Sequence, residues 1–390
     1  MFIGYRAVLL AALAVMLSMP VAAADFNIGY VQLKKDSRYA RTRTYARYLG
    51  QALGRPYTGA KVALKEVKFH GAEVDVEFKL TRKRRKSAVS IVKAIRDMAA
   101  EGTRFILVDA PEDTLERVAR ETAGLEIVLF NVSARGDQLR ANLCLPHVLH
   151  VVPSHAMRND ALVQHLVARK WREVLLLVGP EPEDEALAKS FERSARRLGI
   201  RIVERRNFIL SNDPRQRELN NPLLLTGKAD YDVVYIADAQ GEFARLTSYK
   251  TQLPRPVVGS DGLTGAAWHW AWERHGAPQL EKRFEKEAER HMASVDWAAW
   301  IAVKAIATAV QRTKSVEFAL LRDYLLSSEL ELDGFKGNRL NFRPWSQQLR
   351  QPMLIASHNW VVDRAPLDGF LHRKNNLDTL GLDEREVQCK

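Results

Sequence analysis

Apolar and polar positions along residues 147–179 predict a strand, a helix and a second strand. An apolar stretch at 148–152 is followed by Ser154, which is placed to cap a helix with apolar residues at helical spacing. A second apolar stretch, 174–178, follows that helix. Complete α/β segments precede and follow this unit, so we expect the chain to leave one lobe here and to begin a second. A two-lobed protein with a cleft is predicted.

The alternation of strands and helices continues on both sides of this unit. It predicts an α/β fold in which each lobe is a mostly parallel sheet flanked by helices. Further strands are expected at 26–33, 74–80, 105–109, 127–132, 200–208, 233–237 and 257–259. Further helices are expected at 58–69, 87–100, 111–123 and 185–198.

Length and composition agree with two packed lobes. The chain has 390 residues, more than the roughly 150 of one domain, and 46% of them are apolar. Lysine and arginine outnumber aspartate and glutamate by 59 to 47, a formal surplus of +12 that attracts anions. Nucleic acid, an acidic membrane and small carboxylates are all compatible with this surplus.

The N-terminal segment, 1–24, has the pattern of a signal peptide. A basic residue precedes an apolar run at 7–19, Pro20 interrupts the run, and three alanines at 22–24 suit a signal peptidase. Cleavage there would leave Asp25 as the mature start and place the protein in the periplasm. The run is shorter than the ~18 residues of a membrane span, and no later stretch reaches that length. Export also argues against nucleic acid as a partner.

The sequence has two cysteines, Cys144 and Cys389, which lie far apart. An oxidising compartment favours a disulfide between them, which would tie the C-terminal tail to the first lobe. Two free thiols are the alternative. A metal site is disfavoured because no Cys-x-x-Cys pair occurs.

Basic and aromatic residues crowd the segment KKDSRYARTRTYARYLG, which follows the first expected strand. Open α/β sheets bind ligands at the carboxyl ends of their strands, so this segment is a candidate anion-binding loop. A solvated surface loop is the alternative for any one of its residues. The candidates are Lys34, Lys35, Arg38, Tyr39, Arg41 and Arg43. A second basic run, 82–86, is expected to be a solvated turn, with loose contact to anionic lipid as an alternative.

Four polar residues lie at or just beyond the carboxyl ends of two other first-lobe strands: Asp109, Asn131, Ser133 and Arg135. A hydroxyl, an amide and a guanidinium that converge there would suit a carboxylate, because arginine donates two parallel hydrogen bonds to its oxygens. Arg135 is the strongest single candidate. Capping or turn roles are the alternative for Asn131 and Ser133.

The second lobe offers candidates by the same positional rule. Asp238 and Phe243 follow the strand at 233–237, although Asp238 could instead cap a helix. Gln240, Glu242, Ser260 and Asp261 are placed similarly.

Tryptophan is the least ordinary feature of the composition. Trp268 belongs to an alternating run of three tryptophans, and Trp297 and Trp300 lie three apart in an expected helix. That spacing predicts core packing for Trp300. Trp268 or Trp297 could stack on an aromatic ligand, which is worth about 0.5 to 1.5 kcal/mol beyond burial. Core packing is the alternative for both.

Several long segments resemble type I periplasmic solute-binding proteins, the branched-chain amino acid class of ABC importers. The segment VVPSHAMRNDALVQHLVARKWREVLLLVGPEPEDEALAKSFERSARRLG resembles the opening of their second lobe. SVDWAAWIAVKAIATAV resembles the helix after their return crossing, and DGFKGNRLNFR their last crossing before a C-terminal β hairpin. PRPVVGSDGL, WHWAWERHGAPQLEKRF, FRPWSQQLRQPMLIAS and APLDGFLHRKNNLDTLG are similar to the subfamily linked to pyrroloquinoline quinone (PQQ)-dependent alcohol catabolism.

This resemblance covers nearly the whole mature chain and implies a Venus-flytrap architecture with three hinge crossings. It implies a first lobe at 25–147 plus about 264–332, a second at 148–263 plus about 333–376, and a tail at 377–390. It also implies a monomeric periplasmic receptor that delivers its solute to an inner-membrane permease and is not an enzyme. The first loop departs from the glycine-rich segment of amino acid binders, which argues against a zwitterionic ligand.

PQQ is a planar quinone with three carboxylates, so its site needs a basic rim and a flat apolar face. We expect the carboxylates to meet Arg135 and the loop 38–43, while Trp268, Trp297 or Phe243 stacks on the ring. PQQ would be cargo and not a catalytic cofactor, and PQQ-dependent alcohol dehydrogenases would be further partners. Closure of the lobes around the ligand would carry the mechanism.

Other functions are alternatives to this one. The ligand could be another small solute, such as an alcohol-derived carboxylate or an amino acid, and the receptor could serve a membrane sensor. An enzyme is disfavoured because His147, His150 and His155 match no usual zinc spacing and no G-x-S-x-G motif occurs. A DNA-binding repressor is disfavoured because an export signal precedes Phe26 in place of a helix-turn-helix.

Overall fold

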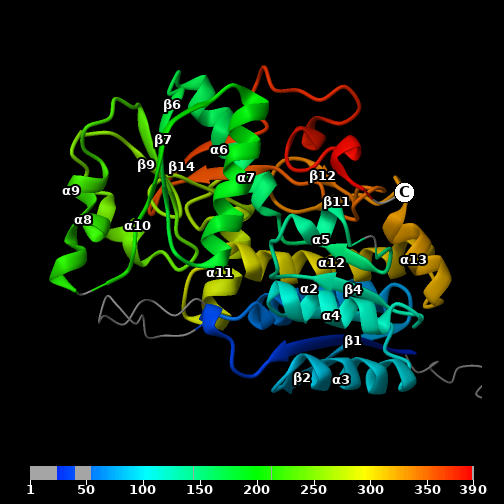
Figure 1. Cartoon of the computed structure of the whole chain (residues 1–390). Coiled ribbons are helices and arrows are strands. Elements are labelled where there is room, and N and C mark those ends of the chain that lie inside the picture. The colour runs from blue at the N-terminus through cyan, green and yellow to red at the C-terminus, as the bar shows by residue number, and fades with distance from the viewer. Residues whose placement is uncertain (1–23, 40–53, 144, 212, 389–390) are drawn as a thin grey trace, which may run out of the picture.

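Two α/β lobes built on separate parallel sheets make up the molecule (Figure 1). The structure is a computed structural model that describes residues 24–39, 54–143, 145–211 and 213–388. Ala24 is the only residue of the expected signal peptide within these ranges. Among the helices of the described residues, none combines the length and the apolar composition needed to cross a membrane.

Five parallel strands form the sheet of the first lobe: β1 (Ala24–Leu33), β2 (Val76–Arg85), β3 (Phe105–Asp109), β4 (Val128–Asn131) and β5 (Val148–His150). They lie in the order β2-β1-β3-β4-β5. The helices of this lobe are α2 (Tyr57–Ala72), α3 (Ala88–Ala100), α4 (Glu112–Thr122), α5 (Gln138–Ala141), α11 (Ala277–Ala288), α12 (Ser294–Thr313) and α13 (Phe318–Leu326). A short ribbon of β11 (Leu332–Asp333) and β12 (Arg339–Leu340) packs on the same core.

Helices cover both faces of this sheet, so its strands are apolar on both sides. Ile28 and Tyr30 of β1 share a core with α2 and α12, and Val31 belongs to a second core with α3 and α4. A doubly covered parallel strand needs a continuous apolar run instead of strict alternation. Gly59 lets α12 lie so close to α2 that a side chain there would overlap the Asp296 carbonyl.

Four parallel strands form the sheet of the second lobe: β6 (Glu173–Val178), β7 (Arg201–Asn207), β8 (Val233–Ala237) and β9 (Val257–Gly259). Their order is β7-β6-β8-β9. One face of this sheet is covered by α6 (His155–Ala168) and α7 (Pro182–Leu198). On its other side lie α8 (Arg217–Asn220), α9 (Pro222–Leu225) and α10 (Glu242–Thr247). An antiparallel sheet of β10 (Thr264–Ala266), β13 (Met353–Ala356) and β14 (Val361–Ala365) packs against α6.

Strand pairing and packing near the expected lobe boundaries are seen at three places. The strand expected to open the second lobe, 148–152, is β5, which pairs with β4 in the sheet of the first lobe. β10 pairs with β13, so the second lobe extends through Ala266. Leu332 and Leu340 pack in the core of the first lobe, so the last crossing follows the β11–β12 ribbon. An apolar run shows that a strand is buried but not which neighbour it pairs with, so the sequence did not predict the pairing of β5 with β4.

Buried polar side chains join the three crossings. The Lys336 Nζ donates hydrogen bonds to the carbonyl oxygens of Ala267 (3.0 Å) and Pro352 (3.0 Å) and to the Gln351 Oε1 (2.8 Å). The Gln351 Nε2 in turn donates to the carbonyl oxygen of Val151 (2.9 Å). Lys336 is fully buried, and burial lowers its pKa well below the ordinary value. The hinge is therefore fixed by directional hydrogen bonds.

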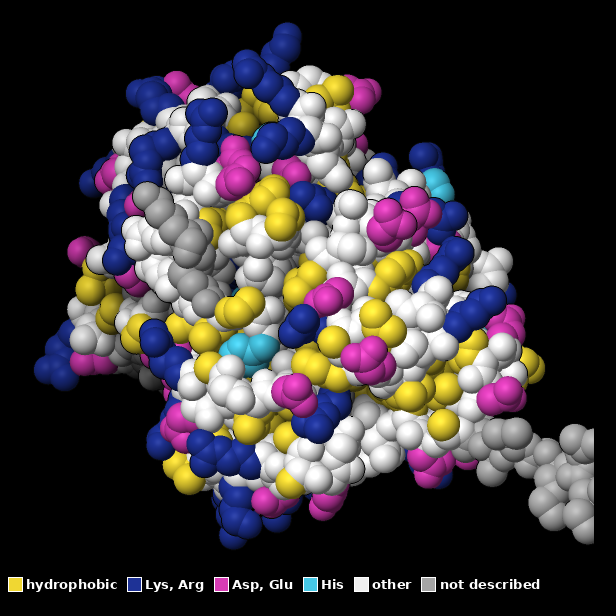
Figure 2. All heavy atoms as spheres, turned by 90° about the vertical axis from the view of Figure 1, so that its right-hand side faces the viewer, with side chains coloured by type: hydrophobic (Ala, Val, Ile, Leu, Met, Phe, Trp, Pro, Cys, Tyr) yellow, Lys and Arg dark blue, Asp and Glu magenta, His cyan; other side chains and the backbone are white. Residues whose placement is uncertain are grey.

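The basic run 82–86 is not the solvated turn that the sequence predicted. β2 continues to Arg85 because it pairs with β1 along its whole length, and it forms one edge of the sheet. Lysine and arginine on an edge strand discourage pairing with other chains. On the face shown in Figure 2, basic and acidic side chains are interspersed, so the surplus of positive charge is not gathered there into one patch.

Candidate anion-binding site

Asp109, at the carboxyl end of β3, organises the wall of the first lobe. Its buried Oδ1 accepts hydrogen bonds from the Tyr39 hydroxyl (2.7 Å) and the Arg38 Nη2 (3.2 Å). Arg38 and Tyr39 belong to a short 3-10 helix, η1 (Ser37–Tyr39), after β1. Burial raises the pKa of Asp109, while Arg38 and the Tyr39 hydroxyl act in the opposite direction. Asp109 thus holds Arg38 and Tyr39 in place.

Ser133 belongs to the same group. The Arg38 Nη1 lies 3.2 Å from the Ser133 Oγ, and that hydroxyl donates to the Ala110 carbonyl (3.3 Å). The Asn131 Oδ1 accepts hydrogen bonds from the backbone N–H groups of Ser133 (3.3 Å) and Ala134 (2.9 Å). Asn131 therefore has the turn role that was its alternative. The structure thus brings together residues from two separate candidate sets, Arg38 and Tyr39 from the first loop and Asp109 and Ser133 from the other strand ends, and their contact with a ligand stays a prediction.

Arg135 follows this turn and lacks a counter-ion. Its Nε is buried without a hydrogen-bond partner, and no carboxylate of the described residues forms an ion pair with its guanidinium. Burial lowers the pKa of Arg135 to about 9, and the neighbouring Arg158 and Arg38 lower it as well. A positive charge held in this way is poised to receive an anion.

Two further arginines complete what we call the arginine cluster: Arg135, Arg140 and Arg158. Arg158, on α6, donates from its Nε to the Gly265 carbonyl (2.8 Å), and burial lowers its pKa. Arg140, on α5, donates to the carbonyls of Ala134 (3.0 Å) and Gly136 (2.9 Å) and shapes the loop that carries Arg135. Burial lowers the pKa of Arg140 to about 10. Within the described residues, none of the three forms an ion pair.

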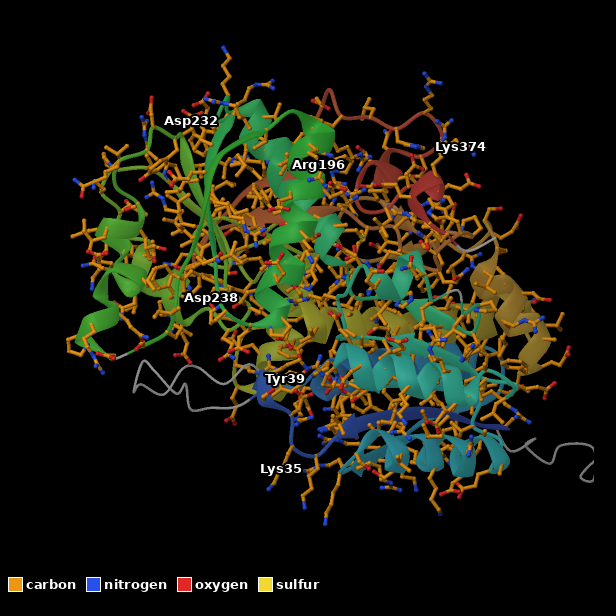
Figure 3. The ribbon with its side chains drawn as sticks, viewed as in Figure 1. Lys35, Tyr39, Arg196, Asp232, Asp238 and Lys374 are labelled. Atoms are coloured by element: carbon orange, nitrogen blue, oxygen red, sulfur yellow. The ribbon has the colours of Figure 1, made fainter. Side chains whose placement is uncertain are left out.

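The cluster draws on both lobes. Arg135 and Arg140 follow β4 of the first lobe, whereas Arg158 lies in the first turn of α6, just after the first crossing. Figure 3 shows that Tyr39 and Asp238 lie on the sides of their lobes that face each other, whereas Asp232 and Arg196 lie at the far end of the second lobe. The carboxyl ends of both parallel sheets therefore meet at the lobe junction.

Comparison with solved structures shows which proteins share this two-lobed fold. No protein-family model matches the sequence, and no curated protein does. An ABC transporter substrate-binding protein from Sphaerobacter thermophilus is 14% identical, with a TM-score of 0.70 over 88% of this chain and 98% of that chain. A branched-chain amino acid ABC transporter periplasmic ligand-binding protein from Burkholderia xenovorans is 12% identical, with a TM-score of 0.68 over 91% and 96%. A solute-binding protein from Rhodopseudomonas palustris, in complex with 3,4-dihydroxybenzoic acid, is 10% identical, with a TM-score of 0.61 over 85% and 93%.

The chain has the fold of a two-lobed periplasmic binding protein. The fold class predicted from the sequence is thereby confirmed, including parallel sheets flanked by helices in both lobes. These structural neighbours are ABC-transporter solute-binding proteins and not enzymes. The periplasmic binding protein fold brings the strand ends of both lobes to one junction, which is where the arginine cluster lies.

Two candidates from the second lobe, Asp238 and Phe243, have structural roles within that lobe. The Asp238 carboxylate accepts hydrogen bonds from the backbone N–H groups of Gly241 (2.9 Å), Phe243 (2.8 Å) and Ala244 (3.0 Å), so it caps α10. The Phe243 ring stacks on Phe208 with their centroids 4.0 Å apart, in the core of that lobe. Asp238 therefore has the capping role that was its alternative, Phe243 has a role in core packing, and ligand contact by either stays a prediction.

The two tryptophans proposed for stacking are core residues of the fold. The Trp268 Nε1 donates to Glu281 (3.0 Å), and the Trp297 Nε1 donates to the Gly334 carbonyl (3.0 Å). Trp268 is 2% exposed and Trp297 is fully buried, so neither ring offers a free face. Trp270 is the exposed member of its run, and its ring is stacked on His291 with centroids 4.6 Å apart.

Four candidates lie outside the described residues: Arg41, Arg43, Cys144 and Cys389. The sequence reasoning missed three residues at the site, namely Arg140, His155 and Arg158. A signal for two of them was available, since His155 and Arg158 stand three apart in the first turn of the helix that Ser154 caps. Arg140 had no comparable signal, because its role depends on carbonyl groups brought together by the fold.

Proposed function

We propose that this protein is a periplasmic solute-binding protein that captures a small anionic solute between its lobes and delivers it to an ABC permease in the inner membrane. The single observation that carries the proposal is Arg135, whose Nε is buried without a hydrogen-bond partner and whose guanidinium has no counter-ion among the described residues. The fold supports the same function, since its structural neighbours are solute-binding proteins.

Capture would work through opposite walls of the junction. An anion between Arg135 and Arg158 would gain charge-assisted hydrogen bonds from both lobes only when they are close together. Such a ligand has greater affinity for the closed state and shifts the population toward it. Arg38 is already paired with Asp36 (2.7 Å) and Asp109 (3.2 Å), so Arg38 and Tyr39 would add hydrogen-bonding groups beside Arg135 and no unpaired charge. The closed form would then be the shape that the permease recognises.

PQQ is the ligand we put forward for the first test. Its three carboxylates match a site with several cations, and the segments that resemble the PQQ-linked subfamily support it. The Rhodopseudomonas palustris neighbour holds an aromatic carboxylate, which lends support to an aromatic acid in general. Tyr39 is an aromatic ring within the site, with the guanidinium carbons of Arg38 and Arg55 at 5.3 and 4.8 Å from its centroid. A second role of the protein would be to supply PQQ to periplasmic dehydrogenases.

The experiment is a calorimetric titration of the mature protein with PQQ, 3,4-dihydroxybenzoate and leucine. We expect saturable binding of PQQ at micromolar concentration and a loss of about 10- to 100-fold in affinity on Arg135→Met, since a hydrogen bond to a charged group is worth about 1.5–3 kcal/mol. Arg196→Gln, at the exposed far end of the second lobe, is the matched control and should bind normally. Tighter binding of leucine than of either anion would overturn an anionic ligand class.

A further inference from the structure

His155 is a half-buried titratable residue among the charges of the candidate site. It is the first residue of α6, and its backbone N–H donates to the Arg135 carbonyl (3.0 Å). Its Nδ1 is buried and has no hydrogen-bond partner, as is true of the Arg135 Nε. His155 and Arg158 are three residues apart and so share one face of α6. Two unpartnered nitrogens thus belong to residues that are joined by a backbone hydrogen bond.

Charged groups from three other elements surround this imidazole. Arg135 and Arg140 act on it from the loop after β4 and from α5, and Arg158 from its own helix. Glu112 of α4 is the carboxylate on the other side, with its Oε1 3.9 Å from the His155 Nε2. Asp137 accepts a hydrogen bond from the adjacent Ala156 N–H (2.8 Å). Three arginines and two carboxylates therefore surround His155, and the arginines lower its pKa.

This surrounding keeps the imidazole neutral while the site holds no anion. Burial lowers the pKa of His155 well below its ordinary value, and the three arginines lower it further. An anion that enters the arginine cluster cancels part of their field, which favours the charged form of the ring. The imidazolium has an N–H donor on both ring nitrogens, so the unpartnered Nδ1 gains a hydrogen bond to donate.

We propose that His155 is a further ligand-binding residue and that it takes up one proton from solvent when an anion binds at the arginine cluster. This inference rests on the proposed function, because it needs an anion at that site. Its consequence is that affinity rises as pH falls, so that capture is favoured in an acidified periplasm. The upper limit of the effect is about a tenfold increase in the association constant per unit of pH.

Calorimetry in two buffers of different ionisation enthalpy measures the number of protons taken up. PQQ and inorganic sulfate serve as probes, since both keep their charge between about pH 5.5 and 8 and contribute no protons. We expect uptake approaching one proton per bound anion near pH 6, and none in His155→Asn, which should still bind at pH 8. His147→Asn is the matched control. His147 is also half-buried, but it precedes β5, whereas His155 follows the carboxyl end of that strand.

Three results would overturn the inference, and they can be told apart. Binding without proton uptake by the wild-type protein would remove it. Uptake that persists in His155→Asn would assign the proton to Glu112 instead. Both results leave the proposed function standing. Failure of PQQ and sulfate to bind at any pH would remove the proposed function and this inference together.

Discussion

Two groups of arginines, each with one fully buried member, lie in this molecule, and only one of the groups is matched by carboxylates. The matched group, which we call the tail cluster, joins the C-terminal segment to the rest of the fold. Its ion pairs include Arg193 to Asp160 (3.1 Å), Arg197 to Asp160 (2.9 Å) and Arg343 to Asp378 (2.8 Å). Although burial opposes the charge, Asp160 and Glu386 raise the pKa of Arg193 above its ordinary value.

The arginine cluster at the lobe junction shows the opposite behaviour. No carboxylate pairs with it among the described residues, and burial lowers the pKa of Arg135 to about 9. A buried charge that lacks a partner costs free energy, and such a group persists where it has a function. The comparison teaches that the balance of nearby charges, more than the number of arginines, separates a structural cluster from a candidate binding site.

Removing the carboxylate of Asp378, which pairs with both Arg343 and Arg350 in the tail cluster, is the strongest test of this difference. In Asp378→Asn, Arg343 would be left buried and uncompensated, since both side chains are 1% exposed. We expect the free energy of unfolding, measured by urea denaturation, to fall by about 3–5 kcal/mol. Glu116→Gln breaks an exposed pair with Arg120 and is the control, with an expected change below about 1 kcal/mol. An equal effect of both variants would contradict the structural role of the tail cluster.

A covalent link near the tail would add to this fastening. Cys144 and Cys389 lie outside the described residues, but the chain segments beside them meet, because the Gln388 N–H donates to the Ala141 carbonyl (2.9 Å). The disulfide stays a prediction. We expect Cys389→Ser to lower the free energy of unfolding by about 2–4 kcal/mol and to alter gel mobility only without reductant. Two titratable thiols in the folded wild-type protein would disprove the link.

Arg135→Met, in the arginine cluster, should not lower the stability of the ligand-free protein, in contrast to Asp378→Asn in the tail cluster. Replacing an uncompensated guanidinium with a buried, unpartnered Nε by an apolar side chain removes a desolvation penalty, so the ligand-free variant should be as stable as the wild type or more stable, by about 1 kcal/mol. The same variant should lose the thermal stabilisation that PQQ confers. Thermal unfolding with and without PQQ measures both effects. A large loss of stability without ligand would show that Arg135 is structural.

The smallest effect concerns pH and His150, which lies beside Arg140. The Asn131 Nδ2 is 3.0 Å from the His150 Nδ1 and donates to it, so the ring is neutral, and burial together with Arg140 lowers its pKa well below the ordinary value. Its stabilising contribution is therefore complete above about pH 6.5 and is lost as pH falls toward the folded-state pKa. As pH falls below about 6.5, we expect the free energy of unfolding of the wild type to decrease more steeply than that of His150→Gln. The difference between the two slopes should be at most about 1.4 kcal/mol per pH unit. Parallel slopes in chemical denaturation would refute this.

The sequence predicted the fold well because its strands are doubly buried and its helices are periodic. The pattern located every strand of both parallel sheets to within a few residues, and the basic strand β2 was predicted too short. It did not reveal that β5 pairs with β4, since pairing depends on which surfaces the fold brings together. The alternation of strands and helices suggested two lobes. The resemblance to type I periplasmic solute-binding proteins implied the same two-lobed architecture.

The site was predicted unevenly for a related reason. The rule that ligands bind at strand ends selected Arg38, Tyr39, Asp109 and Ser133 as two separate sets, and the structure joins them by hydrogen bonds. The same rule failed for Asp238, because a carboxylate after a strand can cap the next helix equally well. Sequence position does not determine whether a side chain is already occupied by its neighbours, and that is what decides between the two roles.

The hydrogen bonds of Lys336 have a consequence for motion. They tie the second and third crossings to one ammonium group, and Gln351 adds the first. The three linkers therefore cannot flex independently, and the lobes should swing as rigid bodies about a single axis. Opening and shutting would then appear as one relaxation in a time-resolved measurement, with a rate that responds to any loosening of this pivot.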